Sequence, residues 1–174
     1  MNMTEKKALK SSMDSYCYAR NVLKGRFEKG ENVISKDAHY SYYYALDILK
    51  GRFEKGKNTI SKNAEYSYLY ARNILKGRFE KGEDIISKDA YYSYQYALKV
   101  LKGRFEKGED VIDAYCSKLY KENIYNIEKE LKIKLEKELK IKLETEQIKL
   151  EKEKKELEEL KMEFEKSELA ELLG

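Results

Sequence analysis

The stretch YALDILKGRFEKG, residues 44–56, decides the fold because close copies of it recur along the chain. The string GRFEKG occurs four times, starting at Gly25, Gly51, Gly77 and Gly103, and each start lies 26 residues after the one before. A Tyr-Ala pair precedes every copy at the same distance. A fixed period without insertions is typical of a solenoid, in which each repeat packs against its neighbours. The repeat frames are residues 11–36, 37–62, 63–88 and 89–114.

Each repeat is predicted to form two helices. The first position of each frame holds a good N-cap residue, whose side chain can bond the free amides of a first turn. These residues are Ser11, Asp37, Asn63 and Asp89. A helix of about 14 residues should follow, within the usual length of globular helices. It should end at the first glycine of GRFEKG, because glycine suits the left-handed position after a helix. A second, shorter helix is expected from RFEKG to the next cap.

The first helix of a repeat should be buried on a wide arc. At 100° per residue, the apolar positions of the second repeat, which run from Tyr40 to Leu49, cover roughly 200°, against about 100° for a surface helix. Small residues, Ser41 and Ala45, lie at the centre of that arc. On the short helix, Phe53, Gly56 and Ile60 share one face. Such faces need neighbours on both sides, so the predicted fold class is all-α, an α-solenoid of helix-pair repeats.

Two other structures fit parts of the pattern less well. A leucine-rich repeat has a similar period, but its L-x-x-L-x-L pattern and asparagine ladder are absent. The Tyr-Ser-Tyr alternation would suit a strand, yet apolar positions such as Ile48 keep the phase of a helix.

The copies of YALDILKGRFEKG resemble short tandem helical repeats found in proteins of bacteriophages and other viruses. Those repeats read roughly as Tyr-Ala-x-x-Val-Leu-Lys-Gly-Arg-Phe, and the resemblance extends over the four frames and into the segment that follows. Such repeats often begin with Asp-Pro, whereas this chain has Asp37-Ala38 and Asp89-Ala90. The family carries no established activity. The resemblance therefore implies a virus-associated solenoid and supplies no catalytic residues.

The array is predicted to end in a capping helix at residues 113–127, with residues 1–10 as an N-terminal arm. After Ile112 the chain passes directly to Asp113-Ala114-Tyr115, two residues short of the repeat pattern. Lys118 and Lys121 then replace apolar residues on the side that a further repeat would cover. A charged outer face is what a terminal repeat of a solenoid requires.

Residues 128–174 are predicted to continue as one long charged helix. The eight residues KELKIKLE occur twice in tandem, at 129–136 and 137–144, and residues 128–166 contain 12 Lys and 13 Glu. Glutamates are expected to pair with lysines four residues later, each pair contributing about 0.2–0.5 kcal/mol. The expected pairs are Glu128–Lys132, Glu130–Lys134, Glu136–Lys140 and Glu138–Lys142.

Two interpretations of this C-terminal helix stay open. Leu143, Leu150, Leu157 and Phe164 recur at intervals of seven, which favours a weak coiled coil with a second chain. The companion positions include Glu146 and Glu153, and the eight-residue tandem drifts out of heptad phase. A solvated single helix is the alternative.

Composition excludes several function classes. The chain has 36 Lys+Arg and 32 Asp+Glu, so its net charge of +4 does not require a nucleic-acid partner. One histidine and two cysteines do not supply a metal site or a catalytic triad, and we expect no enzyme and no cofactor. No apolar run is long enough for a membrane span, and no secretory signal is visible. We expect a cytoplasmic protein, in the host cytoplasm if viral, with Cys17 and Cys116 reduced.

The residues that differ between otherwise identical repeats are the candidates for binding a partner. They occupy the third, seventh and tenth positions of each frame, which should lie opposite the buried arc, and apolar residues on such a stripe suggest a contact surface. The candidate partner-binding residues are His39, Tyr43, Leu46, Glu65, Leu69, Arg72, Tyr91, Gln95 and Leu98. Met13, Cys17 and Arg20 are their counterparts in the first repeat. Neutral drift, or cover by the C-terminal helix, would leave the same variation.

Two functions from different classes fit these features. The first is a non-enzymatic protein-interaction scaffold or adaptor that binds a protein through this stripe, with the C-terminal helix as spacer or weak oligomeriser. The second is nucleic-acid binding through the lysines and the arginine ladder of Arg26, Arg52, Arg78 and Arg104. We expect each arginine to pair instead with the glutamate two residues later. The tyrosines could stack on bases, but they lie on the buried arc and are expected to pack.

Overall fold

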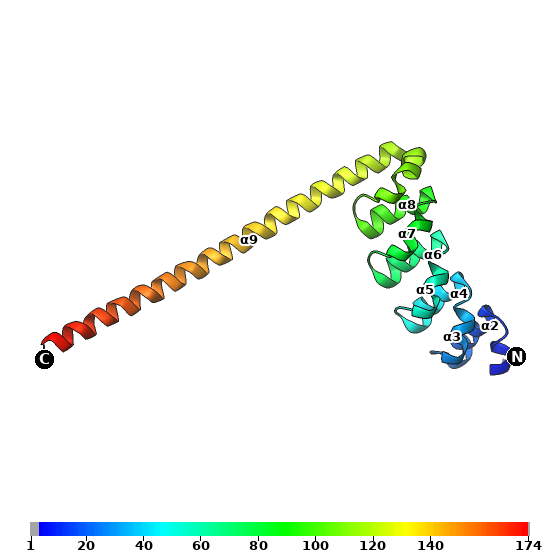
Figure 1. Cartoon of the computed structure of the whole chain (residues 1–174), viewed down its shortest axis with the longest axis horizontal. Helices are drawn as coiled ribbons and strands as arrows, with labels where there is room; N and C mark the ends of the chain where they lie inside the picture. Colours follow the sequence, from blue (N-terminus) through cyan, green and yellow to red (C-terminus); the bar gives the residue numbers. More distant parts are fainter. Residues whose placement is uncertain (1–3, 174) are drawn as a thin grey trace. The chain divides into compact units, whose positions relative to one another are not determined.

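The computed structural model describes the backbone of residues 4–173 and the side chains of residues 4–166. This part of the chain contains helices and turns but no strands, which confirms the all-α fold class (Figure 1). The chain divides into two compact units between Ile127 and Glu128. Each unit is described by itself.

The first unit is built from helix pairs. The first helix of each pair starts as an α-helix and ends in a wider π-helical turn. These segments are α2 (Ser12–Cys17) with η1 (Tyr18–Leu23), α4 (Ala38–Tyr43) with η3 (Tyr44–Leu49), α6 (Ala64–Leu69) with η5 (Tyr70–Leu75), and α8 (Ala90–Tyr96) with η6 (Ala97–Leu101). A short helix, α1 (Glu5–Ala8), precedes them.

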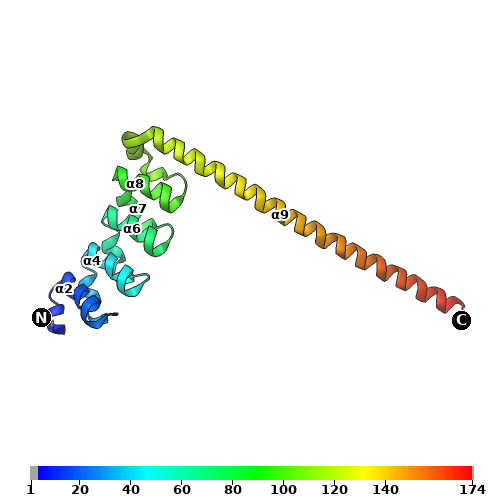
Figure 2. The same ribbon diagram turned by 180° about the vertical axis from the view of Figure 1, so that it is seen from behind.

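The second helix of each pair is short. It consists of η2 (Glu28–Gly30) with α3 (Glu31–Ile34), η4 (Glu54–Gly56) with α5 (Lys57–Ile60), α7 (Glu80–Ile86), and η7 (Glu106–Gly108) leading into α9 (Glu109–Leu173). Each of α2, α4 and α6 contacts the short helix of its own repeat and the first helix of the next (Figures 1 and 2). The result is the solenoid expected from the repeat period.

The helix starts agree with the sequence, but the helix ends do not. Ser11, Asp37, Asn63 and Asp89 each accept a bond from the amide three residues later. The left-handed residue after each helix is the lysine and not the glycine: Lys24, Lys50, Lys76 and Lys102 have φ of 49–51°, and no described glycine has positive φ.

The π-helical turn explains this correction. The amide of Gly51 reaches back to the carbonyl of Ala45 at 3.1 Å, and the other three copies do the same. Gly51 therefore stands one position beyond the left-handed residue. Lys50 occupies that position itself, although a side chain there costs roughly 1–2 kcal/mol.

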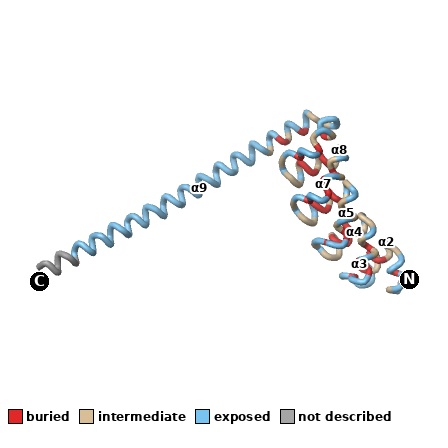
Figure 3. Tube along the Cα trace, viewed as in Figure 1, coloured by how far each residue is buried: buried red, intermediate tan, exposed pale blue. Residues whose placement is uncertain are grey.

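The core consists of the residues that all four repeats share. In the second repeat these are Ser41, Tyr42, Tyr44, Ala45, Phe53, Gly56 and Ile60, and the buried trace in Figure 3 follows them and their copies along the first unit. The hydroxyl of Tyr44 accepts a bond from the amide of Phe27 at 2.8 Å, which joins one repeat to the next. Tyr70 and Tyr96 repeat this bond to Phe53 and Phe79.

The second glycine of each GRFEKG copy is needed for close packing. A Cβ added at Gly56 would lie 2.7 Å from the Cβ of Ser41 and 2.5 Å from a ring carbon of Phe53. At Gly51 the nearest atom would be the carbonyl oxygen of Leu49 at 3.7 Å, an ordinary contact. Only the second glycine lets the short helix approach the first.

The chain turns within α9, at Cys116, whose φ of −159° and ψ of 48° are not helical. Beyond the turn, Tyr120 and Ile124 are buried. The hydroxyl of Tyr120 accepts a bond from the amide of Phe105 at 3.2 Å, as Tyr96 does for Phe79 one repeat earlier. Residues 117–127 thus close the last repeat with the same contact that joins the others.

The second unit, which starts at Glu128, is helical, and its described side chains through Lys166 are all exposed (Figure 3). The ion pairs formed in this unit are not the expected ones. They run from a lysine to the glutamate four residues later, as in Lys134–Glu138 at 3.8 Å and Lys140–Glu144 at 3.9 Å. That orientation is the less favourable one for the helix dipole. Among the described helices, none is long and apolar enough to cross a membrane.

Candidate interaction surfaces

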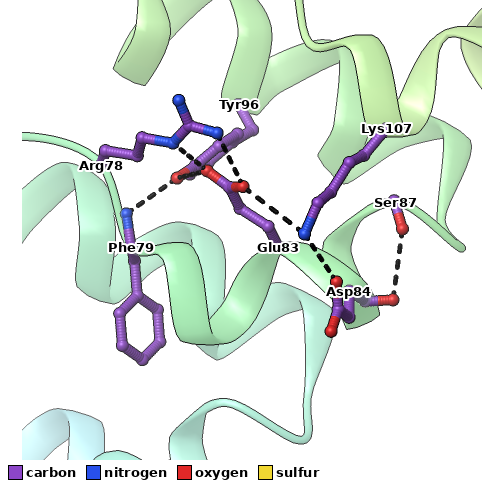
Figure 4. A network of polar contacts seen from close by, with 7 residues as sticks. All are labelled: Arg78, Phe79, Glu83, Asp84, Ser87, Tyr96 and Lys107. Carbon is purple, nitrogen blue, oxygen red and sulfur yellow. Dashed lines mark hydrogen bonds and ion pairs between the residues drawn. The ribbon is translucent and has the colours of Figure 1, made fainter.

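A glutamate bound by an arginine lies on the short helix in three of the four repeats. It is buried at the centre of a polar network in the first and third repeats, and Figure 4 shows the copy in the third. Glu83 is 1% exposed. Its two oxygens accept hydrogen bonds from Nε and Nη2 of Arg78 at 2.6 and 3.0 Å. The hydroxyl of Tyr96 donates to the same carboxylate at 3.1 Å while accepting from the amide of Phe79. One carboxylate therefore connects the short helix, the preceding loop and the next repeat.

A lysine from the following repeat completes the network. Nζ of Lys107 lies 3.9 Å from Glu83 and 2.8 Å from Asp84. In the first repeat, Glu31 binds Arg26 at 2.7 Å and Lys55 of the second repeat at 3.1 Å. The network therefore holds consecutive repeats together by charge as well as by packing.

The arginine ladder is thus used mainly inside the fold. Among the described residues, the expected pair with the glutamate two residues later forms only in the first repeat, and there it is the longer of two. Arg26 lies 2.7 Å from Glu31 and 3.7 Å from Glu28, the residue predicted as its partner. Arg78 and Arg104 likewise take the glutamate five residues later, Glu83 and Glu109. The glutamate two residues after the arginine stays on the exposed side of the turn, and it lies farther from the guanidinium than the glutamate five residues after it.

The protonation of these carboxylates reflects their partners. Burial alone would raise the pKa of Glu31, but hydrogen bonds from Arg26 and Lys55 outweigh it and lower that pKa below its ordinary value. The hydrogen bond from Arg104 lowers the pKa of Glu109. Both residues are therefore carboxylates at neutral pH.

The second repeat breaks the pattern. Lys57 stands where the other repeats have Glu31, Glu83 and Glu109. Within the described part of the chain, Arg52 has no carboxylate within ion-pair distance, and the hydroxyl of Tyr70 accepts from Phe53 without donating to a carboxylate. Neither the network nor this exception was predicted from the sequence. The signal was present, since 57 is the position where an otherwise constant glutamate becomes a lysine.

The predicted partner-binding stripe is exposed only in part. His39, Glu65, Arg72 and Tyr91 are exposed, with Tyr91 at 50%. The other five residues are half-buried, and the apolar ones pack against the core, which corrects the expectation of a fully exposed stripe. These five are Tyr43, Leu46, Leu69, Gln95 and Leu98.

The π-helical turn again gives the reason. From Tyr44 onward each residue rotates by less than the 100° assumed for an α-helix, so Leu46 and Leu98 lie nearer the core than expected. At the seventh position, aromatic neighbours reduce the exposure of the side chain. The ring of Tyr43, for example, lies 6.5 Å from that of Tyr16 in the preceding repeat.

Around the stripe, aromatic rings connect one repeat to the next. Nδ1 of His39 lies 2.7 Å from the hydroxyl of Tyr66, and its ring also contacts Tyr40 and Tyr43. Further along, Tyr68 contacts Tyr92 with 5.9 Å between ring centroids. His39 is therefore on the surface, as expected, but it belongs to an aromatic row. Such rows offer a partner rigid side chains that lose little entropy on binding.

Tyrosine hydroxyls beside the stripe are held by polar residues. The hydroxyl of Tyr16 donates to Asp47 at 2.5 Å. Burial, and to a lesser extent this hydrogen bond, raises the pKa of Tyr16 to about 12. Asn73 donates to the hydroxyl of Tyr42 at 2.7 Å. The exposed Arg72 takes part in the same way, because it donates to the hydroxyl of Tyr68 at 2.9 Å.

A second apolar surface lies on the C-terminal helix. Leu131, Leu135 and Leu139 line a shallow apolar groove together with the aliphatic parts of neighbouring charged residues. Leu143, Leu150 and Leu157, of the seven-residue series, are 51–55% exposed. Within the described part of this unit, these leucines have no neighbour that covers them.

The chain matches no protein-family model, no curated protein and no solved structure. The function therefore has to be inferred from the surfaces described above.

Proposed function

We propose that this protein is a non-enzymatic protein-interaction scaffold that binds a protein partner through the first-helix face of its solenoid. One observation carries this proposal: the apolar residues packed between repeats are the same in every repeat, whereas the exposed third position holds Met13, His39, Glu65 and Tyr91. A constant core with a varied outer row is the organisation by which solenoids present extended binding surfaces.

The exposed part of the stripe is chemically mixed, which suits a protein ligand. Tyr91 and His39 supply aromatic contact area, while Glu65 and Arg72 supply opposite charges. Interfaces between proteins are enriched in tyrosine and arginine and gain specificity from such charges. The C-terminal helix would extend roughly 70 Å at about 1.5 Å per residue. In this proposal it acts as a spacer, or joins two chains weakly along residues 143–164.

The resemblance to viral repeats bears on where such a partner would be found. If the chain is virus-encoded, the partner is a protein of the virus or of its host, and the scaffold works in the host cytoplasm. This part of the proposal rests on the sequence motifs alone.

Nucleic-acid binding is the weaker candidate. Arg26, Arg78 and Arg104 are engaged with Glu31, Glu83 and Glu109, so three of the four ladder arginines would have to give up a carboxylate to bind phosphate. The net charge of +4 adds little attraction. Retention on heparin with a steep salt dependence would contradict the scaffold proposal and favour this alternative.

The scaffold proposal is tested by crosslinking in the native cell with three forms of the full chain. The stripe variant combines His39→Ala, Glu65→Ala, Arg72→Ala and Tyr91→Ala, all at exposed positions. The control combines Lys36→Ala, Lys62→Ala and Lys88→Ala, which are equally exposed but lie after the short helices. A protein crosslinked to the wild type and the control but lost from the stripe variant is the expected result. The same crosslinked proteins for all three forms would refute the assignment of the stripe.

A further inference from the structure

The junction between the second and third repeats has the donors of the carboxylate network without its carboxylate. In the first repeat, Glu31 is bonded by Arg26, by Lys55 of the next repeat and, at 3.5 Å, by the hydroxyl of Tyr44. The corresponding donors around the second repeat are Arg52, Lys81 and Tyr70, and all three are present. The acceptor at their centre is replaced by Lys57, which reverses the charge at that position.

The donors at this junction have found only partial substitutes. The ammonium of Lys81 donates to the neutral side chain of Asn58. Tyr70 is fully buried, and its hydroxyl is used as an acceptor by Phe53, as in the other repeats. In repeats one and three the equivalent hydroxyl also gives its hydrogen to the glutamate. A buried hydroxyl whose hydrogen is not donated to any acceptor costs free energy, and an anion beside it would remove that cost.

Neighbouring carboxylates do not take the missing position. Glu54 lies 3.4 Å from Lys57, and no ion pair joins it to Arg52 in the described structure. The first repeat explains why: Glu28, which corresponds to Glu54, coexists with Glu31 and lies farther from the guanidinium. Glu54 is instead paired with Lys57, so it does not take the missing position beside Arg52.

A pocket of about 510 Å³ opens at this junction. Its lining includes the cations Arg52, Lys57, Arg78 and Lys81, the carboxylates Glu54 and Glu80, and apolar surface from Leu75 and Phe79. Arg78 is engaged with Glu83. Arg52 has no carboxylate partner in the described structure, and Lys81 is bonded to the neutral Asn58 alone, so both can turn toward a ligand. The pocket therefore combines a guanidinium fork, an ammonium and an apolar floor.

We propose that this pocket binds a carboxylate supplied by a ligand, which takes the place that Glu31, Glu83 and Glu109 occupy in the other repeats. Those repeats show the geometry: Arg78 and Arg104 each hold their glutamate with two bonds of 2.6–3.0 Å. Arginine forks match a carboxylate in this way and are strengthened by a second cation nearby. The source of the carboxylate is an acidic peptide segment, a choice that rests on the proposed scaffold function.

The test uses the full chain and a defined probe, so it does not depend on finding the partner. The chain has six arginines, and their Nε–Hε signals can be followed separately by ¹⁵N NMR. Capped hexaglutamate is titrated, with capped hexaglutamine as the uncharged probe and inorganic phosphate as the alternative anion. We expect a saturable shift of Arg52 with hexaglutamate alone, while Arg26 and Arg104, already held by Glu31 and Glu109, stay unchanged.

Two variants of equal charge make the test specific. Lys57→Glu restores the internal carboxylate and should weaken hexaglutamate binding at least tenfold. Lys62→Glu makes the same charge change at an exposed position outside the pocket and should leave binding within about twofold. Arg52→Gln removes the guanidinium from an exposed position, so the fold should survive while binding is lost. Thermal unfolding of each variant checks that it is folded.

Three results would overturn the proposal. The first is no saturable shift of Arg52 at millimolar hexaglutamate. The second is equal binding by Lys57→Glu and Lys62→Glu, which would indicate attraction by net charge alone. The third is tighter binding of inorganic phosphate than of hexaglutamate, which would make the pocket a phosphate site. A failure here would leave the binding stripe of the scaffold untouched, because the crosslinking test does not alter this pocket.

Discussion

The two units of this chain use the same lysine and glutamate side chains in opposite ways. In the solenoid, Glu31 and Glu83 are 2% and 1% exposed, and each collects an arginine, a tyrosine hydroxyl and a lysine from the next repeat. In the C-terminal helix, pairs such as Lys149–Glu153 and Lys155–Glu159 stand 3.8–3.9 Å apart with both side chains mostly in water. Exposed pairs of this kind contribute little to stability.

Periodicity accounts for the difference. A 26-residue repeat returns each residue to the same environment, so one glutamate per repeat can be buried among partners that also return. In the C-terminal helix an eight-residue tandem is followed by a seven-residue series, and neither keeps an apolar face long enough to bury a neighbour within the chain. Charge pairs there stabilise the helix locally, whereas charge pairs in the solenoid join separate repeats.

The largest effect should come from the glycine at which the short helix packs closely against the first helix of its repeat. Gly82→Ala would place a Cβ 2.6–2.7 Å from Phe79 and Ser67, and we expect it to destabilise the solenoid by about 3 kcal/mol. The control is Gly77→Ala, whose Cβ would meet only the carbonyl oxygen of Leu75 at 3.9 Å. That substitution should be neutral or stabilise by up to about 1 kcal/mol. Chemical denaturation measures both, and equal midpoints would show that the close contact is not needed.

A smaller loss should follow from removing the buried charge of the network. Glu83→Gln keeps the shape but replaces one acceptor oxygen by an NH2 donor, so the charge and at least one of the two bonds from Arg78 are lost. We expect a loss of about 2 kcal/mol. Arg78 is 57% exposed, so water can solvate it and limit the cost. Glu80→Gln, at an exposed position of the same turn, serves as the control and should change stability by less than about 0.5 kcal/mol.

Most of the architecture could be predicted from sequence, while the details that depend on helix geometry could not. The repeat frames, the caps at residues such as Asp37 and the shared core at Tyr44 and Ile60 follow from period and residue type. The π-helical turns do not, because nothing in the side chains of residues 44–49 distinguishes a wider turn from an α-helix. Two errors follow from that omission: the left-handed residue was placed at Gly51 instead of Lys50, and Leu46 was expected on the surface.

Distance along the sequence also does not predict which glutamate each arginine binds. Glu28 is nearer to Arg26 along the chain, but the turn between them directs the guanidinium toward Glu31. Comparing repeats would have found the site, because a position that is Glu in three copies and Lys57 in the fourth indicates a local change of chemistry. Of the candidate stripe, the third position and Arg72 are exposed as predicted. The partial burial of the seventh position, and of Leu46 and Leu98 at the tenth, depends on the neighbouring repeat and on the π-helical turn.

Acid should weaken the solenoid through the same carboxylates. The pKa of Glu31 and that of Glu109 are lowered by their partners in the folded chain, from ordinary values of 4.5. Folding therefore gains stability from these groups above about pH 4.5, and loses it as pH falls through their folded pKa values. Urea midpoints measured from pH 7 to pH 3 should therefore decrease once the pH drops below about 4.5. The double variant Glu31→Gln and Glu109→Gln should show a shallower decline, and an identical decline would place the acid sensitivity elsewhere.

The smallest effect on stability, and the clearest on mass, is expected from the C-terminal helix. Leu150 and Leu157 are exposed and belong to the second unit, so Leu150→Lys combined with Leu157→Lys should leave the unfolding midpoint of the first unit unchanged. If the seven-residue series joins two chains, this variant should be monomeric where the wild type is a dimer, because two lysines in a seam cannot be desolvated without partners. Leu131→Lys with Leu135→Lys is the matched control, since it removes equal apolar surface outside that series. Light scattering across a concentration series up to about 100 μM measures the result, a range in which an association of about −8 kcal/mol would be nearly complete. A wild type that stays monomeric throughout would leave the helix as a spacer and confine all association of this protein to the solenoid.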